Sequence, residues 1–141
     1  MDVENILERE GELLEIAFTR LSEMTDVSVL QGNTRKRLGI ISFIVEGAHY
    51  NLIVRLLNDK FGIQARGGCS CAGTYGHHLL NVDRAWSQNI WSAIHSGDLS
   101  CKPGWVRISL HPTMTNREVE FIMDAIESTA SNFRGWMADY N

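Results

Sequence analysis

The sequence has no excess of positive charge that could support nucleic-acid binding. Its 13 lysines and arginines are scattered along the chain and are outnumbered by 17 aspartates and glutamates, for a formal net charge of -4. A chain of this kind has no basic surface to hold a phosphate backbone. We therefore expect no nucleic-acid partner.

The sequence also has no long apolar run and too few cysteines for a disulfide framework. Acidic residues follow Met1 at once, where a secretion signal carries positive charge, and no apolar stretch is long enough to span a bilayer. The three cysteines are an odd number, and a reducing compartment keeps them as thiols. These absences predict a cytoplasmic protein with no membrane partner.

The composition is typical of a globular protein. The chain has 141 residues, of which 44% are hydrophobic and 21% are charged. This length lies in the usual one-domain range and allows a sizeable core. We predict a single domain over residues 1–141.

The first part of the chain shows one helical pattern and two strand patterns. Apolar residues recur at helical spacing over residues 5–22, although Gly11 weakens the middle of this helix. Two runs rich in β-branched residues, 27–30 and 40–45, are separated by the polar segment 31–37. This pattern predicts two strands linked as a hairpin.

A second helix and a short strand follow. Residues 49–61 have a helical apolar face and end at Gly62, a residue that tolerates the positive φ of a helix C-terminus. Residues 63–66 are predicted to form a short strand that leads into a glycine- and cysteine-rich loop.

The second half of the chain is predicted to close the domain. Residues 82–95 form a helical pattern, which the segment 97–104 interrupts. Residues 105–110 alternate as a strand, with Val106, Ile108 and Leu110 on the core face and Trp105, Arg107 and Ser109 on a face that can hold a ligand. A capping box at residues 115–118 begins a long final helix. The order of elements predicts an α+β fold, with a small, mainly antiparallel sheet of about four strands covered by helices.

The loop ARGGCSCAG, residues 65–73, is the strongest chemical signal in the sequence. Its glycines lack side-chain bulk, so a cysteine can lie exposed at a mobile tip, and the nearby Arg66 favours the reactive thiolate. The alternative is that the cysteines pack as small hydrophobic residues.

Two other interpretations of this region remain open. Cys69, Cys71, His77 and His78 are possible metal ligands, although their spacing is not that of a usual zinc site. A disulfide between Cys69 and Cys71 would close a strained and easily reduced ring.

Arg107 is the second chemical signal, because a guanidinium within an apolar strand needs an anionic partner or a path to solvent. A substrate carboxylate is one such partner, and a structural aspartate or glutamate is another.

These segments together resemble the C-terminal small domain of the class V aminotransferases, pyridoxal-phosphate enzymes of fold type I that include the cysteine desulfurases and selenocysteine lyases. The resemblance runs over about residues 38–129. Residues 56–73, LLNDKFGIQARGGCSCAG, are similar to the family's helix, short strand and active-site loop. The family's Arg-x-Gly-x-x-Cys pattern is represented by Arg66, Gly68 and Cys71. Residues 104–126 are similar to the strand that carries the substrate-carboxylate arginine, at Arg107, and to the helix after it.

The resemblance implies a sulfur-transfer function. Cys71 would be the catalytic nucleophile that accepts sulfur as a persulfide, while Arg107 and Arg66 would bind the small amino-acid substrate. Pyridoxal phosphate would serve as the electron sink in the full-length family.

The family's large domain, with its cofactor lysine, has no counterpart in this sequence. Lys36, Lys60 and Lys102 lie in a polar turn, at a helix end and in a Pro-Gly loop, and we assign none of them to the cofactor. We therefore expect no cofactor on this chain alone, no catalysis without a partner that supplies the large domain, and a possible homodimer. The alternatives are a sulfur-relay or interaction module with a reactive cysteine, or a metal-binding domain.

Overall fold

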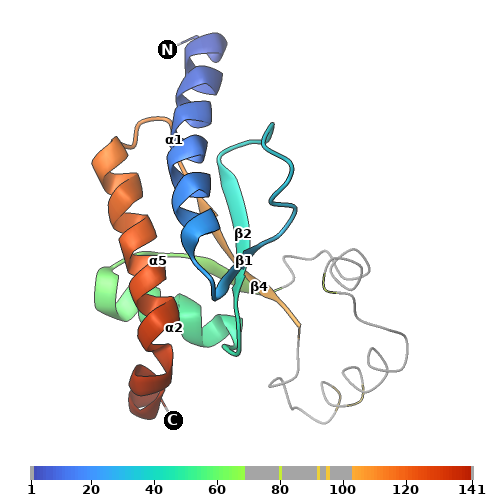
Figure 1. Cartoon of the computed structure of the whole chain (residues 1–141), viewed down its shortest axis with the longest axis vertical. Coiled ribbons are helices and arrows are strands. Elements are labelled where there is room, and N and C mark those ends of the chain that lie inside the picture. The colour runs from blue at the N-terminus through green and yellow to red at the C-terminus, as the bar shows by residue number, and fades with distance from the viewer. Residues whose placement is uncertain (1, 69–79, 81–91, 93–94, 96–102, 141) are drawn as a thin grey trace.

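The structure is a computed structural model, and it describes residues 2–68, 80, 92, 95 and 103–140 (Figure 1). The elements in chain order are α1 (Val3–Glu23), β1 (Val27–Val29), β2 (Ile40–Val45), α2 (Tyr50–Phe61), β3 (Arg66–Gly68), β4 (Trp105–Ser109), α5 (Asn116–Trp136) and the short 3-10 helix η1 (Met137–Tyr140). The predicted helix over residues 82–95 lies almost entirely outside the described residues and stays a prediction.

The four strands form one antiparallel sheet in the order β1-β2-β4-β3. The central pair joins β2 to β4, with Ile41 opposite Ile108 and Ser42 opposite Arg107. β1 and β3 are the edge strands. The predicted α+β fold with a small antiparallel sheet is confirmed.

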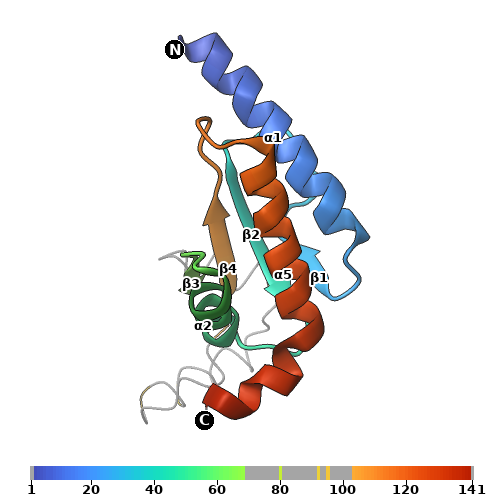
Figure 2. The same cartoon turned by 90° about the vertical axis from the view of Figure 1, so that its left-hand side faces the viewer.

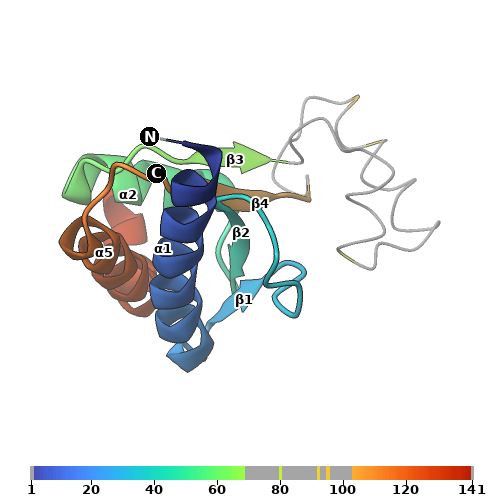
Figure 3. The same cartoon turned by 90° about the horizontal axis from the view of Figure 1, so that it is seen from above.

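The α-helices that the structure describes, α1, α2 and α5, cover the same face of the sheet (Figures 2 and 3). The alternation of β2 and β4 explains why, because Ile41, Phe43 and Val106 have at most 1% of their surface exposed and belong to the core beneath the helices. The opposite face carries no described helix. We call this second face the open face.

The first and last helices pack against each other through one arginine of α1. Arg20 forms ion pairs of 2.7 to 2.8 Å with three carboxylates of α5, those of Glu120, Asp124 and Glu127. Hydrogen bonds to Asp124 and Glu127 hold the pKa of Arg20 above its ordinary value. Two helices far apart in the sequence are thus joined at their outer surface.

The predicted capping box at the start of α5 is confirmed. The Thr115 side chain accepts a hydrogen bond from the Glu118 amide, and the Glu118 carboxylate accepts one from the Thr115 amide. Two amides that the helix leaves unpaired are thereby satisfied.

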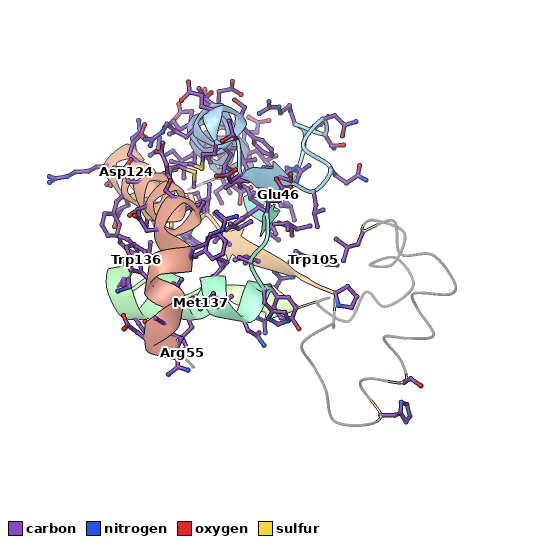
Figure 4. All side chains as sticks on the ribbon, turned by 60° about the horizontal axis from the view of Figure 1, so that its bottom comes forward. Glu46, Arg55, Trp105, Asp124, Trp136 and Met137 are labelled. Carbon is purple, nitrogen blue, oxygen red and sulfur yellow. The ribbon has the colours of Figure 1, made fainter. Side chains whose placement is uncertain are left out.

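The C-terminal end of the chain packs against α2 (Figure 4). The ammonium of Lys60 lies 4.6 Å from the ring centre of Trp136, and Phe61 contacts the same ring system with centroids 6.3 Å apart. Arg55 lies over Tyr140 at 5.0 Å. Trp136 therefore packs, partly buried, against the core.

The third strand differs from its prediction. We expected a strand over residues 63–66, whereas β3 is Arg66–Gly68 and shares only its first residue with that range. Gly62 ends α2 in the left-handed region at φ 68°, and the Ile63 amide bonds back to the Leu57 carbonyl. Since residues 63–65 are needed to lead the chain from the helix end to the sheet, pairing begins only at Arg66.

Within the described residues, no helix combines the length and the apolar character that crossing a membrane requires.

Candidate functional site

Two arginines and a serine form a row across three strands on the open face. Arg66 of β3 lies directly opposite Arg107 of β4, and Arg107 lies directly opposite Ser42 of β2. The row places both of the arginines that the sequence singled out at one position of the sheet. Its serine was not predicted, because Ser42 stands within an apolar run and only the register brings it to this site.

Arg107 lies in an apolar setting, and one nitrogen of its side chain has no partner among the residues that the structure describes. Its neighbours Val106 and Ile108 are buried in the core on the other face, at 1% and 4% exposure. Arg107 itself is half-buried, and its Nε atom is shielded from solvent with no hydrogen-bond acceptor among the described residues. A shielded N–H with no acceptor is costly, so the position is suited to an added anion.

No carboxylate of the described residues neutralises the two arginines. The ion pairs in this part of the chain involve Arg9, Arg20 and Arg55, and neither Arg66 nor Arg107. Like charges directly opposite on adjacent strands repel. A structural aspartate or glutamate, the alternative partner that the sequence allowed for Arg107, is therefore not found among the described residues.

The face predicted for ligand binding is only partly open. Arg107 is half-buried and Ser109 is exposed, as expected. Trp105, in contrast, is buried at 5% exposure. Trp105 pairs with Gly68 on this face and does not belong to the core under the helices. It lies at the beginning of β4, at the end of the sheet away from Asp124 (Figure 4).

Sequence reasoning missed one residue beside this site, the aromatic Tyr50. Its ring packs against Gly67 and Gly104, so that a Cβ atom built on either glycine would lie within 2.8 Å of the ring. The sequence signal was present in the glycines, but Gly67 was interpreted as freeing the loop and Gly104 as part of the segment that interrupts the helical pattern.

The predicted nucleophile Cys71 lies outside the described residues, as do Cys69, His77 and His78. Their roles in sulfur transfer, metal binding or a disulfide stay predictions. Within the described part of the chain, no cluster of three His, Cys, Asp or Glu residues could hold a metal ion.

The comparisons with known proteins identify the family. The model of the family described as aminotransferase class-V matches residues 1–122. The chain belongs to this family, as the resemblance of its motifs predicted. No curated protein matches the sequence.

Two solved structures of similar fold are cysteine desulfurases. One is CsdA from Escherichia coli in an S-sulfonic acid form, with 18% identity and a TM-score of 0.59, covering 93% of this chain and 27% of that chain. The other is the apo enzyme from Thermococcus onnurineus NA1, with 23% identity and a TM-score of 0.59, covering 92% of this chain and 27% of that chain. The chain thus spans about a quarter of the length of these structures.

The family depends in general on pyridoxal phosphate, but the described lysines do not fit that cofactor. Lys36 is an exposed residue of the 31–37 turn, and Lys60 lies over Trp136 at the far end of α2. Neither belongs to the row of Arg66, Arg107 and Ser42. We derive no chemical step through the cofactor on these residues.

Proposed function

We propose that this chain supplies the substrate-carboxylate site and the sulfur-accepting cysteine of a cysteine-desulfurase-like enzyme. The observation that carries the proposal is the register of Arg66 and Arg107, together with the shielded Nε of Arg107, which has no partner in the described part of the chain. A guanidinium presents its N–H groups in a planar fork that matches a carboxylate, and this geometry favours an amino-acid substrate.

The arginine row would bind and orient the substrate. The carboxylate of the amino acid would accept hydrogen bonds from Arg107, and Arg66 would add a second positive charge from the solvent side. Such orientation brings the reacting atoms together without further loss of freedom. Ser42 stands next to Arg107 as a further hydrogen-bonding group.

Cys71 would accept the sulfur atom of the substrate. Its thiolate would attack the substrate sulfur, forming an S–S bond while the substrate C–S bond breaks. The electron pair of that bond would remain on the substrate carbon, which takes up a proton to give alanine. The products are a persulfide on Cys71 and free alanine.

The activated substrate would come from a partner that holds pyridoxal phosphate. This part of the proposal is supported by the family's general dependence on pyridoxal phosphate and by the lack of a suitable lysine among the described residues. The open face, where Ile40 is 40% exposed, is a surface that such a partner could cover.

The first test is binding of a carboxylate to the 141-residue chain. Titration of the isotope-labelled chain with L-alanine should shift the NMR signals of β3 and β4, and Arg107→Gln should abolish the shifts. Arg55→Gln is the matched control, because Arg55 lies on α2, which covers the opposite face of the sheet, and is paired with Asp59. Equal shifts in the wild type and Arg107→Gln would contradict the proposed site.

The second test concerns catalysis. The chain alone should develop no aldimine absorbance with pyridoxal phosphate and should release no alanine from cysteine. When the chain is combined with the cofactor-bearing partner, mass spectrometry should detect one added sulfur atom on Cys71. Cys71→Ser should remove this added sulfur and Cys69→Ser should not. Alanine release by the chain alone would refute the proposal that the chain needs a cofactor-bearing partner for catalysis.

A further inference from the structure

The Tyr50 ring lies against the backbone of three glycines at the ends of β3 and β4. A Cβ atom on Gly67 would be 2.8 Å from Cδ2 of the Tyr50 ring, and one on Gly104 would be 2.6 Å from Cε1. The ring also lies 3.8 Å from the Cβ position of Gly68, whose φ of +112° favours glycine. The backbone can approach the ring this closely at Gly67 and Gly104 only because both residues are glycine, whereas a Cβ on Gly68 would make an ordinary contact with the ring.

The three glycines belong to the two adjacent strand ends. Gly67 and Gly68 are the last residues of β3, and Gly104 directly precedes β4. A Cβ on Gly104 would also lie 2.8 Å from the Cα atom of Gly68. The tyrosine ring therefore spans the junction between β3 and β4, beside which α2 lies (Figure 2).

The ring and the two arginines lie on opposite faces of the same strands. Gly67 pairs with Val106, which is buried under the helices, whereas Arg66 and Arg107 pair one position along and belong to the open face. Side chains alternate between the two faces of a strand. Tyr50 thus packs on the helix-covered face of the strands whose open face carries both arginines.

β3 depends on such support because few other contacts among the described residues stabilise it. It is an edge strand of three residues, and two of them are glycines that lose much backbone freedom on ordering and offer no side chain for packing. Its remaining residue faces another arginine of the same charge. The contacts of Tyr50 and Val54 with Gly67 supply apolar packing that the strand itself lacks.

We propose that Tyr50 is a positioning residue, whose ring holds β3 against β4 and so keeps Arg66 opposite Arg107 for anion binding. The role of the arginines in binding a substrate carboxylate rests on the proposed function. The support of β3 by the ring does not. The ring carries this role, so that phenylalanine should replace tyrosine at this position.

The primary experiment measures amide hydrogen exchange in the 141-residue chain. In Tyr50→Ala, protection of the β3 amides should fall by about tenfold or more relative to the amides of β2, because the edge strand opens locally. Tyr50→Phe should keep the wild-type ratio. Unchanged β3 protection in Tyr50→Ala, or a loss in Tyr50→Phe equal to that in Tyr50→Ala, would overturn the proposal.

Phe61→Ala is the matched control, since it truncates an aromatic residue at the other end of the same helix. Phe61 contacts Trp136 and none of the three glycines. It should lower the stability of the whole chain while the ratio of β3 to β2 protection stays at the wild-type value. A fall in this ratio as large as that of Tyr50→Ala would show that any weakening of α2 releases β3 and would refute a specific role for Tyr50.

A double-mutant cycle with Gly67→Ala tests direct contact and does not require Tyr50→Ala to be fully stable. The three atoms nearest to the added methyl group belong to the side chains of Tyr50 and Val54, so Gly67→Ala should weaken β3 in the wild type and much less in Tyr50→Leu. Equal effects in the two backgrounds would contradict contact with the ring.

The carboxylate titration then separates this proposal from the proposed function. If the wild type binds L-alanine, Tyr50→Ala should bind it several-fold more weakly and Tyr50→Phe and Phe61→Ala should bind it normally. If the wild type binds no L-alanine but Tyr50→Ala still releases β3, the proposed function fails and the support by Tyr50 stands. Normal binding by Tyr50→Ala would overturn the positioning role.

Discussion

Arg66 and Arg107 lie directly opposite each other on adjacent antiparallel strands, with no carboxylate of the described residues paired to either. Opposed like charges lower stability in the absence of a ligand. Their retention at one site is understandable if an anion binds there, because a negative group would convert the repulsion into attraction.

Removal of Arg66 should therefore stabilise the free chain. We expect Arg66→Gln to raise the free energy of unfolding by roughly 0.2–1 kcal/mol, the range for cross-strand charge pairs, and to weaken binding of L-alanine. This rise in the free energy of unfolding should be smaller at about 1 M salt than at low salt, because salt screens exposed charges. Urea unfolding at low salt and at about 1 M salt measures the difference between Arg66→Gln and the wild type. A less stable Arg66→Gln would indicate that Arg66 has a structural partner.

Replacement of Thr129 by an apolar residue of the same shape should make the chain more stable. Thr129 is completely buried in α5, and its hydroxyl has no hydrogen-bond partner among the described residues. Thr129→Val should raise the free energy of unfolding by about 1 kcal/mol, because the shielded hydroxyl is removed while the volume is kept.

Thr129→Ser is the matched comparison, since it keeps the hydroxyl and loses the methyl group. It should be less stable than the wild type. Thermal and urea unfolding give both values, and destabilisation by Thr129→Val would mean that the hydroxyl is satisfied.

One substitution, glycine to alanine, should have opposite effects at two helical positions. Gly11 lies within α1, and a Cβ atom there meets nothing within 4 Å, so Gly11→Ala should stabilise by about 1 kcal/mol through helix propensity. Gly62 ends α2 at φ 68°, so Gly62→Ala should destabilise by about 1 kcal/mol through strain. Equal signs in urea unfolding would contradict these backbone conformations.

The capping box of α5 should make stability depend on pH. Hydrogen bonds from Thr115 hold the pKa of Glu118 below its ordinary value of 4.5. The stabilisation from a carboxylate with a lowered pKa is present above the unfolded-state pKa and is lost as the pH falls through the folded-state pKa. Glu118→Gln should therefore be less stable than the wild type at neutral pH, and the difference should shrink in acid.

Thr115→Ala tests the other half of the capping box. It should cost about 1 kcal/mol at neutral pH, as is usual for loss of a helix N-cap. Urea midpoints across the acid range would measure both variants, and a constant gap between the wild type and Glu118→Gln would contradict the lowered pKa.

Much of the fold could be predicted from sequence because it depends on local patterns. The helical spacing before Ser22, the capping box at Thr115 and the alternation around Arg107 each involve residues within a few positions of one another. Local propensity and side-chain periodicity act at this range, and the structure confirms those elements.

The third strand was misplaced because its pairing is decided by packing. Ile63 has a high strand propensity and the two glycines after Arg66 have a low one, so sequence favoured the earlier segment. The pairing of the glycines with β4, and their close approach to Tyr50, outweigh that preference.

The sequence by itself determined which residues carry charge, which faces are apolar and which family the chain resembles. Each of these properties depends only on the residue types and on their spacing over short stretches of the chain. Only the tertiary structure decided that Arg66 faces Arg107, that Ser42 joins their row and that Tyr50 supports it from behind. The physical reason is that strand register and helix docking join residues far apart in the chain. No local pattern determines their contacts.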